Sequence, residues 1–223
     1  MMNHIKPYSL FESENLAGLV ALAKASDDYI AFIKKTNSNN YNDSIRYDIL
    51  YRGMADDNVL TDKSFMTDWW EHARDYGDTI DGVVLKGNDV LRMTGAEFEK
   101  LRDKLGSVTK KELQGIYSYY FKHDKLFDVM EGEYAEGKDV IRFVFDFLRS
   151  DVPYTKIQND KVKNDLMIPV MLHYATKLRG KNVISFVGGD YSDYGGADEF
   201  VVDDVSRYTK LSDIWKGAKK IKR

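Results

Sequence analysis

Residues 45–54 read IRYDILYRGM, and this stretch decides the fold class because its apolar side chains recur at every second position. The recurring positions are Ile45, Tyr47, Ile49 and Tyr51. A period of two is typical of a β-strand that buries one of its faces. The segments on both sides of this stretch follow the helical period instead. The sequence therefore predicts an α+β fold.

The segment before this strand predicts a helical N-terminal section over residues 1–43. Its apolar side chains between residues 10 and 35 recur at helical spacing. The stretch that follows, residues 36–43, is rich in asparagine. Because asparagine favours turns over regular helix, we expect this stretch to form a polar loop.

The segment after the strand predicts a short helix and then more strand. Asp68 and Glu71 have the spacing of a capping box, in which side chains satisfy free backbone donors at a helix start. Gly77 is expected to end this helix. Residues 82–86, GVVLK, predict the next strand, and residues 88–93 a short extended continuation.

A helical insertion is predicted over residues 94–182. Two further capping-box spacings mark helix starts, at Thr94 with Glu97 and at Thr109 with Glu112. Residues 139–149 fit both a helical and an alternating pattern, and we expect a helix. Residues 160–179 predict a last helix, with Pro169 inside it and Gly180 after it.

The chain is expected to close with a strand at VISFV, a glycine-rich loop, a second strand at EFVV and a basic tail over residues 210–223. We interpret residues 1–223 as a single domain, with two intimate subdomains as the alternative, because this length lies at the upper end of one-domain size.

Composition excludes several classes of function. The chain has 33 basic and 36 acidic residues and a net charge of -3, so its overall field does not attract nucleic acid. It has no cysteine, which excludes disulfides, zinc–thiolate sites and cysteine nucleophiles. No apolar run is long enough for a membrane span or a signal peptide. We expect a cytoplasmic protein without a metal or a membrane partner, in which the four histidines are structural.

Two neighbouring stretches carry candidate binding residues. Arg52 ends a predicted strand, where a guanidinium offers planar donors to a diphosphate, and Gly53 lets a ligand approach the backbone. In KSFMTDWW, Ser64 and Thr67 either bind a ribose hydroxyl or cap the helix that follows. The aromatic residues of this region provide flat surface for a nicotinamide or adenine ring, or belong to the core: Phe65, Trp69, Trp70 and Tyr76.

The third candidate stretch is GGDYSDYGGADEFVVDD, in which Glu199 opens an apolar strand after a glycine-rich loop. A carboxylate there can stabilise positive charge on a sugar carbon as a leaving group departs. The alternative is a solvated acidic loop. A calcium loop starting at Asp190 is disfavoured because its twelfth position is Val201, where a bidentate glutamate is needed.

In this order and spacing, LYRGM, SFMT with TDWWEHARDYG, and EFVVDD resemble the ADP-ribosyltransferase family of the arginine, serine, glutamate type, in particular its small phage and bacterial members. The resemblance covers residues 45–93 and 183–210. It implies a two-sheet core with an NAD site. NAD is the substrate, and ADP-ribose passes to an acceptor that is either protein or nucleic acid.

The resemblance also implies a role for each candidate residue. Arg52 holds the NAD diphosphate, Thr67 (or Ser64, if the register differs) supports the ribose and the catalytic carboxylate, and Glu199 is that carboxylate. Gly53, Phe65, Trp69 and Tyr76 line the NAD site. Tyr191 and Tyr194, on the loop before Glu199, lie where the family recognises its acceptor.

One position departs from the family pattern. Members that modify arginine have Glu or Gln two residues before the catalytic Glu, where this chain has Ala197. Another acceptor, or hydrolysis of NAD, is the consequence if the chain is active. The alternatives are a non-enzymatic phage virion or host-interaction protein on a degenerate transferase fold, and an unrelated α+β domain. A phage origin implies the host cytoplasm or the virion as the location.

Overall fold

The chain forms two compact units, and each is built from segments that are distant in the sequence. The computed structural model describes residues 8–41, 49–55, 60–86, 88–123, 137–158, 161–187 and 198–220. The first unit combines Met1–Leu60, Met66–Asn88 and Val205–Arg223, and the second combines Thr61–Phe65 and Asp89–Asp204. Both units contain helices and strands, so the predicted α+β class is confirmed.

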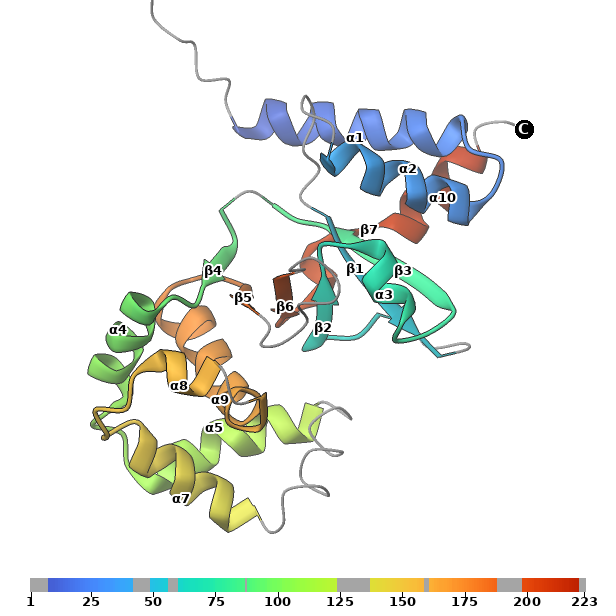
Figure 1. The fold of residues 1–223 in the computed structure, drawn as a ribbon. Helices are drawn as coiled ribbons and strands as arrows, with labels where there is room; N and C mark the ends of the chain where they lie inside the picture. Colours follow the sequence, from blue (N-terminus) through green and yellow to red (C-terminus); the bar gives the residue numbers. More distant parts are fainter. Residues whose placement is uncertain are drawn as a thin grey trace, which may run out of the picture. The chain divides into compact units, whose positions relative to one another are not determined.

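The first unit packs four helices with an antiparallel sheet (Figure 1). Its helices are α1 (Tyr8–Lys24), α2 (Tyr29–Tyr41), α3 (Trp70–Arg74) and α10 (Leu211–Lys220). Its strands are β1 (Ile49–Met54), β3 (Thr79–Val84), β7 (Thr209–Lys210) and the last two residues of β2 (Ser64–Thr67), and a 3-10 turn, η3, covers Val205–Arg207. The strand order is β2-β1-β3-β7.

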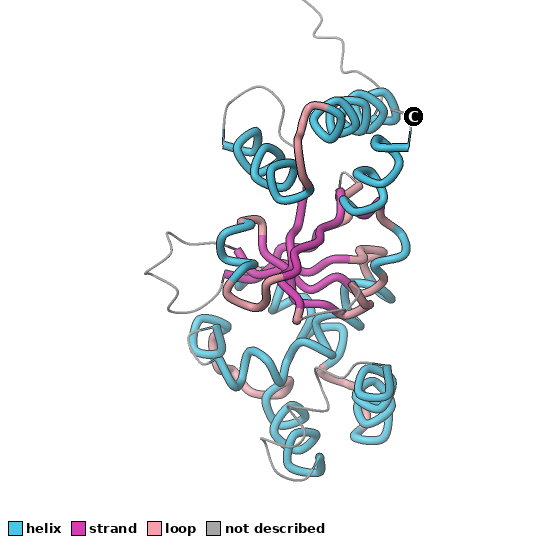
Figure 2. The backbone as a smooth tube through the Cα atoms, turned by 90° about the vertical axis from the view of Figure 1, so that its right-hand side faces the viewer, coloured by secondary structure: helices cyan, strands magenta, loops and turns pink. Residues whose placement is uncertain are grey.

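The core of the first unit lies between one face of this sheet and the helices α1, α2, α3 and α10, which appear in cyan beside the magenta strands in Figure 2. The face of β1 that carries Ile49 and Tyr51 is buried there, as the alternating sequence pattern requires. The predicted strand is therefore confirmed over 49–54. Phe32 of α2 and Trp215 of α10 stack in the same core, with ring centroids 5.8 Å apart.

One local prediction for the first unit was wrong, and one predicted helix is present. The polar stretch after residue 35 does not form a loop at once, because α2 continues to Tyr41. The helix predicted after Asp68 is present as α3. Trp69 takes its N-cap position and makes no side-chain cap bond. The hydroxyl of Thr67 accepts a hydrogen bond from the backbone N–H of Trp69 at 3.3 Å.

The C-terminal segment is not a tail in the described part of the chain. Over 209–220 it forms β7 and then α10, whose Leu211, Ile214 and Ala218 are buried in the core of the first unit. The prediction of a basic tail from residue 210 was wrong because the lysines alternate with this apolar stripe at helical spacing.

The described part of residues 94–182 lies in the second unit and is largely helical, as predicted. The helices of this unit are α4 (Gly95–Leu105), α5 (Lys110–His123), α7 (Gly137–Phe147), α8 (Tyr154–Gln158), α9 (Lys161–His173) and the π-helical segment η1 (Tyr174–Leu178). Its strands are β4 (Val90–Arg92), β5 (Val183–Val187) and β6 (Asp198–Val202). The strand order is β4-β5-β6, with β2 next after β6.

Two helix starts of the second unit follow the predicted chemistry. At the start of α4, the hydroxyl of Thr94 accepts a hydrogen bond from the backbone N–H of Glu97 at 3.2 Å. At the start of α5 the capping box is complete, because Thr109 and Glu112 each accept the other's backbone N–H, at 3.2 Å and 2.7 Å. Both predicted helix starts are confirmed, while the reciprocal pair of bonds is seen at Thr109 and Glu112; at Thr94 the backbone N–H is bonded to the carbonyl of Arg92.

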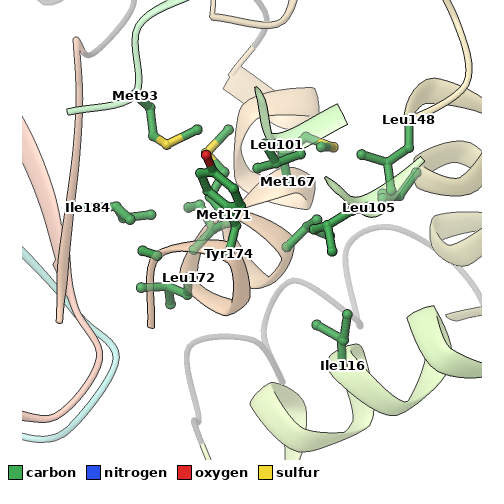
Figure 3. Close-up of a cluster of buried hydrophobic side chains, with 14 of the residues drawn as sticks. Met93, Leu101, Leu105, Ile116, Leu148, Met167, Met171, Leu172, Tyr174 and Ile184 are labelled. Carbon is green, nitrogen blue, oxygen red and sulfur yellow. The ribbon is translucent and has the colours of Figure 1, made fainter. Parts of the chain in front are cut away.

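The core of the second unit is larger than that of the first and is built mainly by the helices. Figure 3 shows Met171, Leu172 and Tyr174 between Ile184 of β5 and Leu101 and Leu105 of α4. Residues 160–179 form α9 and η1 and not one regular helix, and Gly180 follows with a positive φ of 64°. Only glycine adopts this conformation readily, so the predicted end of the helix is confirmed.

Candidate functional site

Arg52 lies in β1 of the first unit and is half-buried. In the register of β1 with β3 it is opposite Asp81, while its neighbour Tyr51 is opposite Gly82. Consecutive residues of a strand point to opposite faces, so the Arg52 side chain points to the sheet face opposite to the one on which Tyr51 is buried.

Gly53 has a packing role in the structure. A Cβ atom at this position would lie 1.9 Å from the carbonyl oxygen of Ala73 and 2.9 Å from the backbone nitrogen of Gly77. A Cβ on Gly77 would in turn lie 2.3 Å from the carbonyl of Met54. The two glycines let β1 and the segment around α3 approach each other backbone to backbone. The space beside Gly53 is filled by the protein and not left for a ligand.

The two candidate hydroxyls are buried and already hydrogen-bonded. Thr67 is 3 % exposed and accepts from Trp69, while Ser64 is 2 % exposed and donates to the carbonyl of Thr61 at 2.5 Å. Thr67 is opposite Tyr51 in the pairing of β1 with β2. Paired residues share a face of the sheet, so Thr67 lies on the face opposite to that of Arg52.

Three of the four candidate aromatic residues pack in the cores. Phe65 packs against the core of the second unit, and Trp69 and Trp70 against that of the first. Tyr76 is 56 % exposed, and its ring meets that of His72 edge to face at 5.3 Å. Among these candidates only Tyr76 presents a largely accessible ring to a ligand.

Glu199 lies in the second unit, where it is half-buried and paired with Phe186 across β5 and β6. It shares a strand face with Val201, which is fully buried in the core of that unit. Tyr191, Tyr194 and Ala197 lie outside the described residues. The structure thus places Arg52 and Thr67 on neighbouring strands of the first unit, with their side chains on opposite faces, and Glu199 in the second unit.

The sequence did not point to Lys63, the only non-glycine residue with a positive φ, 58°, in the described part of the chain. Its side chain is buried, with the ammonium 3.6 Å from the carboxylate of Asp203 and 5.4 Å and 5.7 Å from the ring centroids of Tyr119 and Tyr120. Burial raises the pKa of Asp203, and the charge of Lys63 opposes this shift. Lys63 is a single lysine after a short turn, so no sequence pattern indicates that it pairs with Asp203.

A second polar cluster of the second unit also escaped the sequence analysis. Glu97 is 8 % exposed and accepts hydrogen bonds from Tyr174 at 2.8 Å and Lys100 at 3.1 Å, and it pairs with Arg179. Burial alone would raise the pKa of Glu97, but the Tyr174 and Lys100 hydrogen bonds and the Arg179 charge outweigh it and lower the pKa. The cluster joins the first turn of α4 to the π-helical segment η1.

This shift predicts a dependence of stability on pH. A carboxylate with a lowered folded-state pKa contributes stability above its unfolded pKa of about 4.3, and the contribution is lost as the pH falls through the folded value. We expect Glu97→Gln to cost about 1.5–3 kcal/mol near neutral pH, the range for a hydrogen-bonded charged group, and to flatten the loss of stability in acid. Urea unfolding of both proteins, near neutral pH and in acid, measures these differences in the free energy of unfolding. Glu99→Gln is the control, because that carboxylate is 57 % exposed.

In the first unit, Asp81 organises a third polar cluster. Its carboxylate accepts hydrogen bonds from the hydroxyl of Tyr29 at 2.9 Å, and from the backbone N–H and the hydroxyl of Ser212 at 3.0 and 2.7 Å. Ser212 stands in the first turn of α10, where free N–H groups need an acceptor. Asp81 therefore holds α2, β3 and α10 together, and burial with the Asp81 charge raises the pKa of Tyr29 well above its usual value.

Comparisons of the chain with protein-family models, with curated proteins and with solved structures gave no match. Within the described residues, no three His, Asp or Glu side chains are grouped as a metal ion requires. Among the same residues, no helix has the length and apolar character needed to cross a membrane.

Proposed function

We propose that this chain binds NAD and transfers ADP-ribose from it to an acceptor, with Arg52 and Glu199 as the residues that handle the dinucleotide. The observation that supports the proposal is that each of its three residues lies in a β-strand: Arg52 in β1, Thr67 in β2 and Glu199 in β6. Along the chain they follow one another in the order that the resemblance gives them.

Accessibility supports the choice of these two residues. Arg52 and Glu199 are half-buried, whereas Thr67 and Ser64 are buried and bonded to backbone groups. A half-buried guanidinium can form paired hydrogen bonds with a diphosphate. We assign Thr67 to shaping the turn from β2 to α3, and Gly53 to packing.

In the proposed reaction, the bond between the nicotinamide nitrogen and the ribose carbon breaks. Its electron pair leaves with the nicotinamide, whose ring charge is neutralised, and the ribose carbon becomes positively charged. The Glu199 carboxylate offsets this charge until an acceptor nucleophile bonds to the carbon and gives its proton to solvent. A preorganised charge of this kind contributes on the order of 3–4 kcal/mol. Arg52 positions the diphosphate and contributes to binding.

The proposal predicts separate effects for the two residues. We expect Glu199→Gln to lower NAD turnover by about 100- to 1000-fold with little change in NAD affinity, since the charge is lost and the shape is kept. We expect Arg52→Ala to weaken NAD binding chiefly. Release of nicotinamide measures turnover, and the thermal shift with NAD measures binding, because NAD at a hundred times its Kd would add about 2.7 kcal/mol of stability.

Asp198→Asn is the matched control, because it removes the carboxylate that directly precedes Glu199 in the chain. Full turnover in Glu199→Gln, or equal losses in both variants, contradicts the role of Glu199. The placement of Arg52 and Thr67 on opposite faces favours a second candidate, a non-enzymatic interaction protein. Absence of any thermal shift with NAD in the unmodified chain would select it.

A further inference from the structure

The C-terminal segment is the most strongly charged part of the first unit. Residues 205–223 contain a single acidic residue, Asp213, and the following basic residues: Arg207, Lys210, Lys216, Lys219, Lys220, Lys222 and Arg223. The last two of these lie outside the described residues. The net charge of the whole chain is -3, but at about 0.1 M salt screening acts over about 10 Å, so a local cluster dominates contacts made there.

Helix α10 presents these charges on one side. Leu211, Ile214 and Ala218 are buried on the other side, and Trp215 packs against the same core. Asp213, Lys216, Gly217 and Lys220 are exposed on the outer side, so one carboxylate shares this face with the two lysines. Because the apolar stripe is already used inside the protein, this helix has no apolar face with which to enter a lipid bilayer.

Lysines of three helices meet at the end of α1. The ammonium of Lys219 donates to the carbonyl of Ser26 at 2.6 Å, and that of Lys35 donates to the carbonyl of Ala25 at 3.0 Å. Lys24 ends α1 immediately before these carbonyls. Two acidic residues also lie on this turn, Asp27 and Asp28, and Asp28 accepts the backbone N–H of Ala31. The exposed face of α10 therefore adjoins a region in which lysines outnumber carboxylates.

Gly217 lies between the exposed lysines and has no packing reason to be glycine. A Cβ atom built there meets nothing within 4 Å. Glycine within a helix is unfavourable, so its presence has a cost that nothing inside the chain explains. Gly115 of α5 is equally open, so an open glycine alone is not decisive. At Gly217, the open space lies on the same helix face as the exposed lysines. The missing side chain allows the backbone of another molecule to approach closely.

We infer that Lys216 and Lys220, on the exposed face of α10 beside Gly217, bind the phosphate backbone of nucleic acid without reading its sequence. Lysines supply point charges for phosphates, and the open glycine permits a close approach. No aromatic side chain is fully exposed on α10, so base stacking is not part of this interaction. The inference does not depend on the proposed activity, because none of these residues handles NAD.

The test is binding of the full chain to a labelled mixed-sequence DNA duplex, followed by fluorescence anisotropy over a range of salt concentrations. Removing one phosphate-binding lysine should reduce affinity by about tenfold at 0.1 M salt and lower the slope of log affinity against log salt by about one. Lys216→Gln/Lys220→Gln is expected to reduce affinity by about 100-fold. Lys110→Gln/Lys111→Gln on α5 of the second unit is the matched control and should leave affinity unchanged.

A glycine variant separates binding from stability. Gly217→Ala should raise the melting temperature, because alanine favours helix, and should weaken DNA binding. Gly115→Ala should raise the melting temperature without affecting binding. No salt-dependent binding by the unmodified chain, equal losses in both lysine pairs, or binding to phosphatidylserine vesicles in place of DNA would each overturn the inference.

Discussion

Gly53→Ala is expected to destabilise the first unit by about 3 kcal/mol or more, the upper end of the cost of overpacking. The added methyl group would lie 1.9 Å from the carbonyl oxygen of Ala73, well inside van der Waals contact. The atoms it meets belong to the backbones of α3 and of Gly77, which cannot change rotamer to make room. Since whole domains are stable by only about 5–15 kcal/mol, this loss is readily measured by urea unfolding.

Gly115→Ala is the control for this prediction, because it adds the same methyl group where nothing lies within 4 Å. It should stabilise the chain by up to about 1 kcal/mol. The pair of variants also decides between two roles for Gly53. If Gly53→Ala keeps its stability and loses only affinity for NAD, Gly53 serves ligand approach and the packing account is wrong.

Lys63→Met is expected to destabilise the second unit by about 3–5 kcal/mol, the cost of leaving a buried carboxylate without its cation. Methionine keeps most of the apolar stem of lysine, so the change removes mainly the charge that faces Asp203 at 3.6 Å. Without Lys63, the pKa of Asp203 should rise further, because burial already raises it. The free energy of unfolding lost in Lys63→Met should therefore become smaller as the pH falls and Asp203 becomes protonated.

Adding Asp203→Asn to Lys63→Met should restore much of the lost stability near neutral pH, because the pair then holds no uncompensated charge. Lys100→Met is a matched control: its ammonium pairs with Glu97 but is 58 % exposed, so its loss should cost under about 1 kcal/mol. A double variant as unstable as Lys63→Met alone would show that shape, and not charge, fixes Lys63.

The sequence predicted those features that depend on neighbours along the chain. The alternation around Tyr51 gave β1, and the Thr109–Glu112 spacing gave the start of α5, because each depends on residues a few positions apart. The loop expected from the asparagine-rich stretch after residue 35 was wrong at its start, because α2 continues to Tyr41. The turn preference of single residues does not show where a packed helix ends.

The candidate site was less predictable because it depends on the sheet face to which each side chain points. Arg52 and Thr67 were chosen by their residue types, but the register of β1 with β2 sends them to opposite faces. The Lys63–Asp203 pair joins residues 140 positions apart, and Asp81 meets Ser212 across 131 positions. Only the assembled sheet brings such residues together.

The long separation along the chain between the first two helices and α10 has a consequence for biosynthesis. Leu19 and Phe32 of the first two helices share a buried core with Leu211 and Ile214. A ribosome adds about 5–20 residues per second, so these early helices wait for some tens of seconds or less before their last partner is made. During translation their apolar faces are open to chaperones, and any stop codon upstream of residue 205 leaves the first unit without its closing helix.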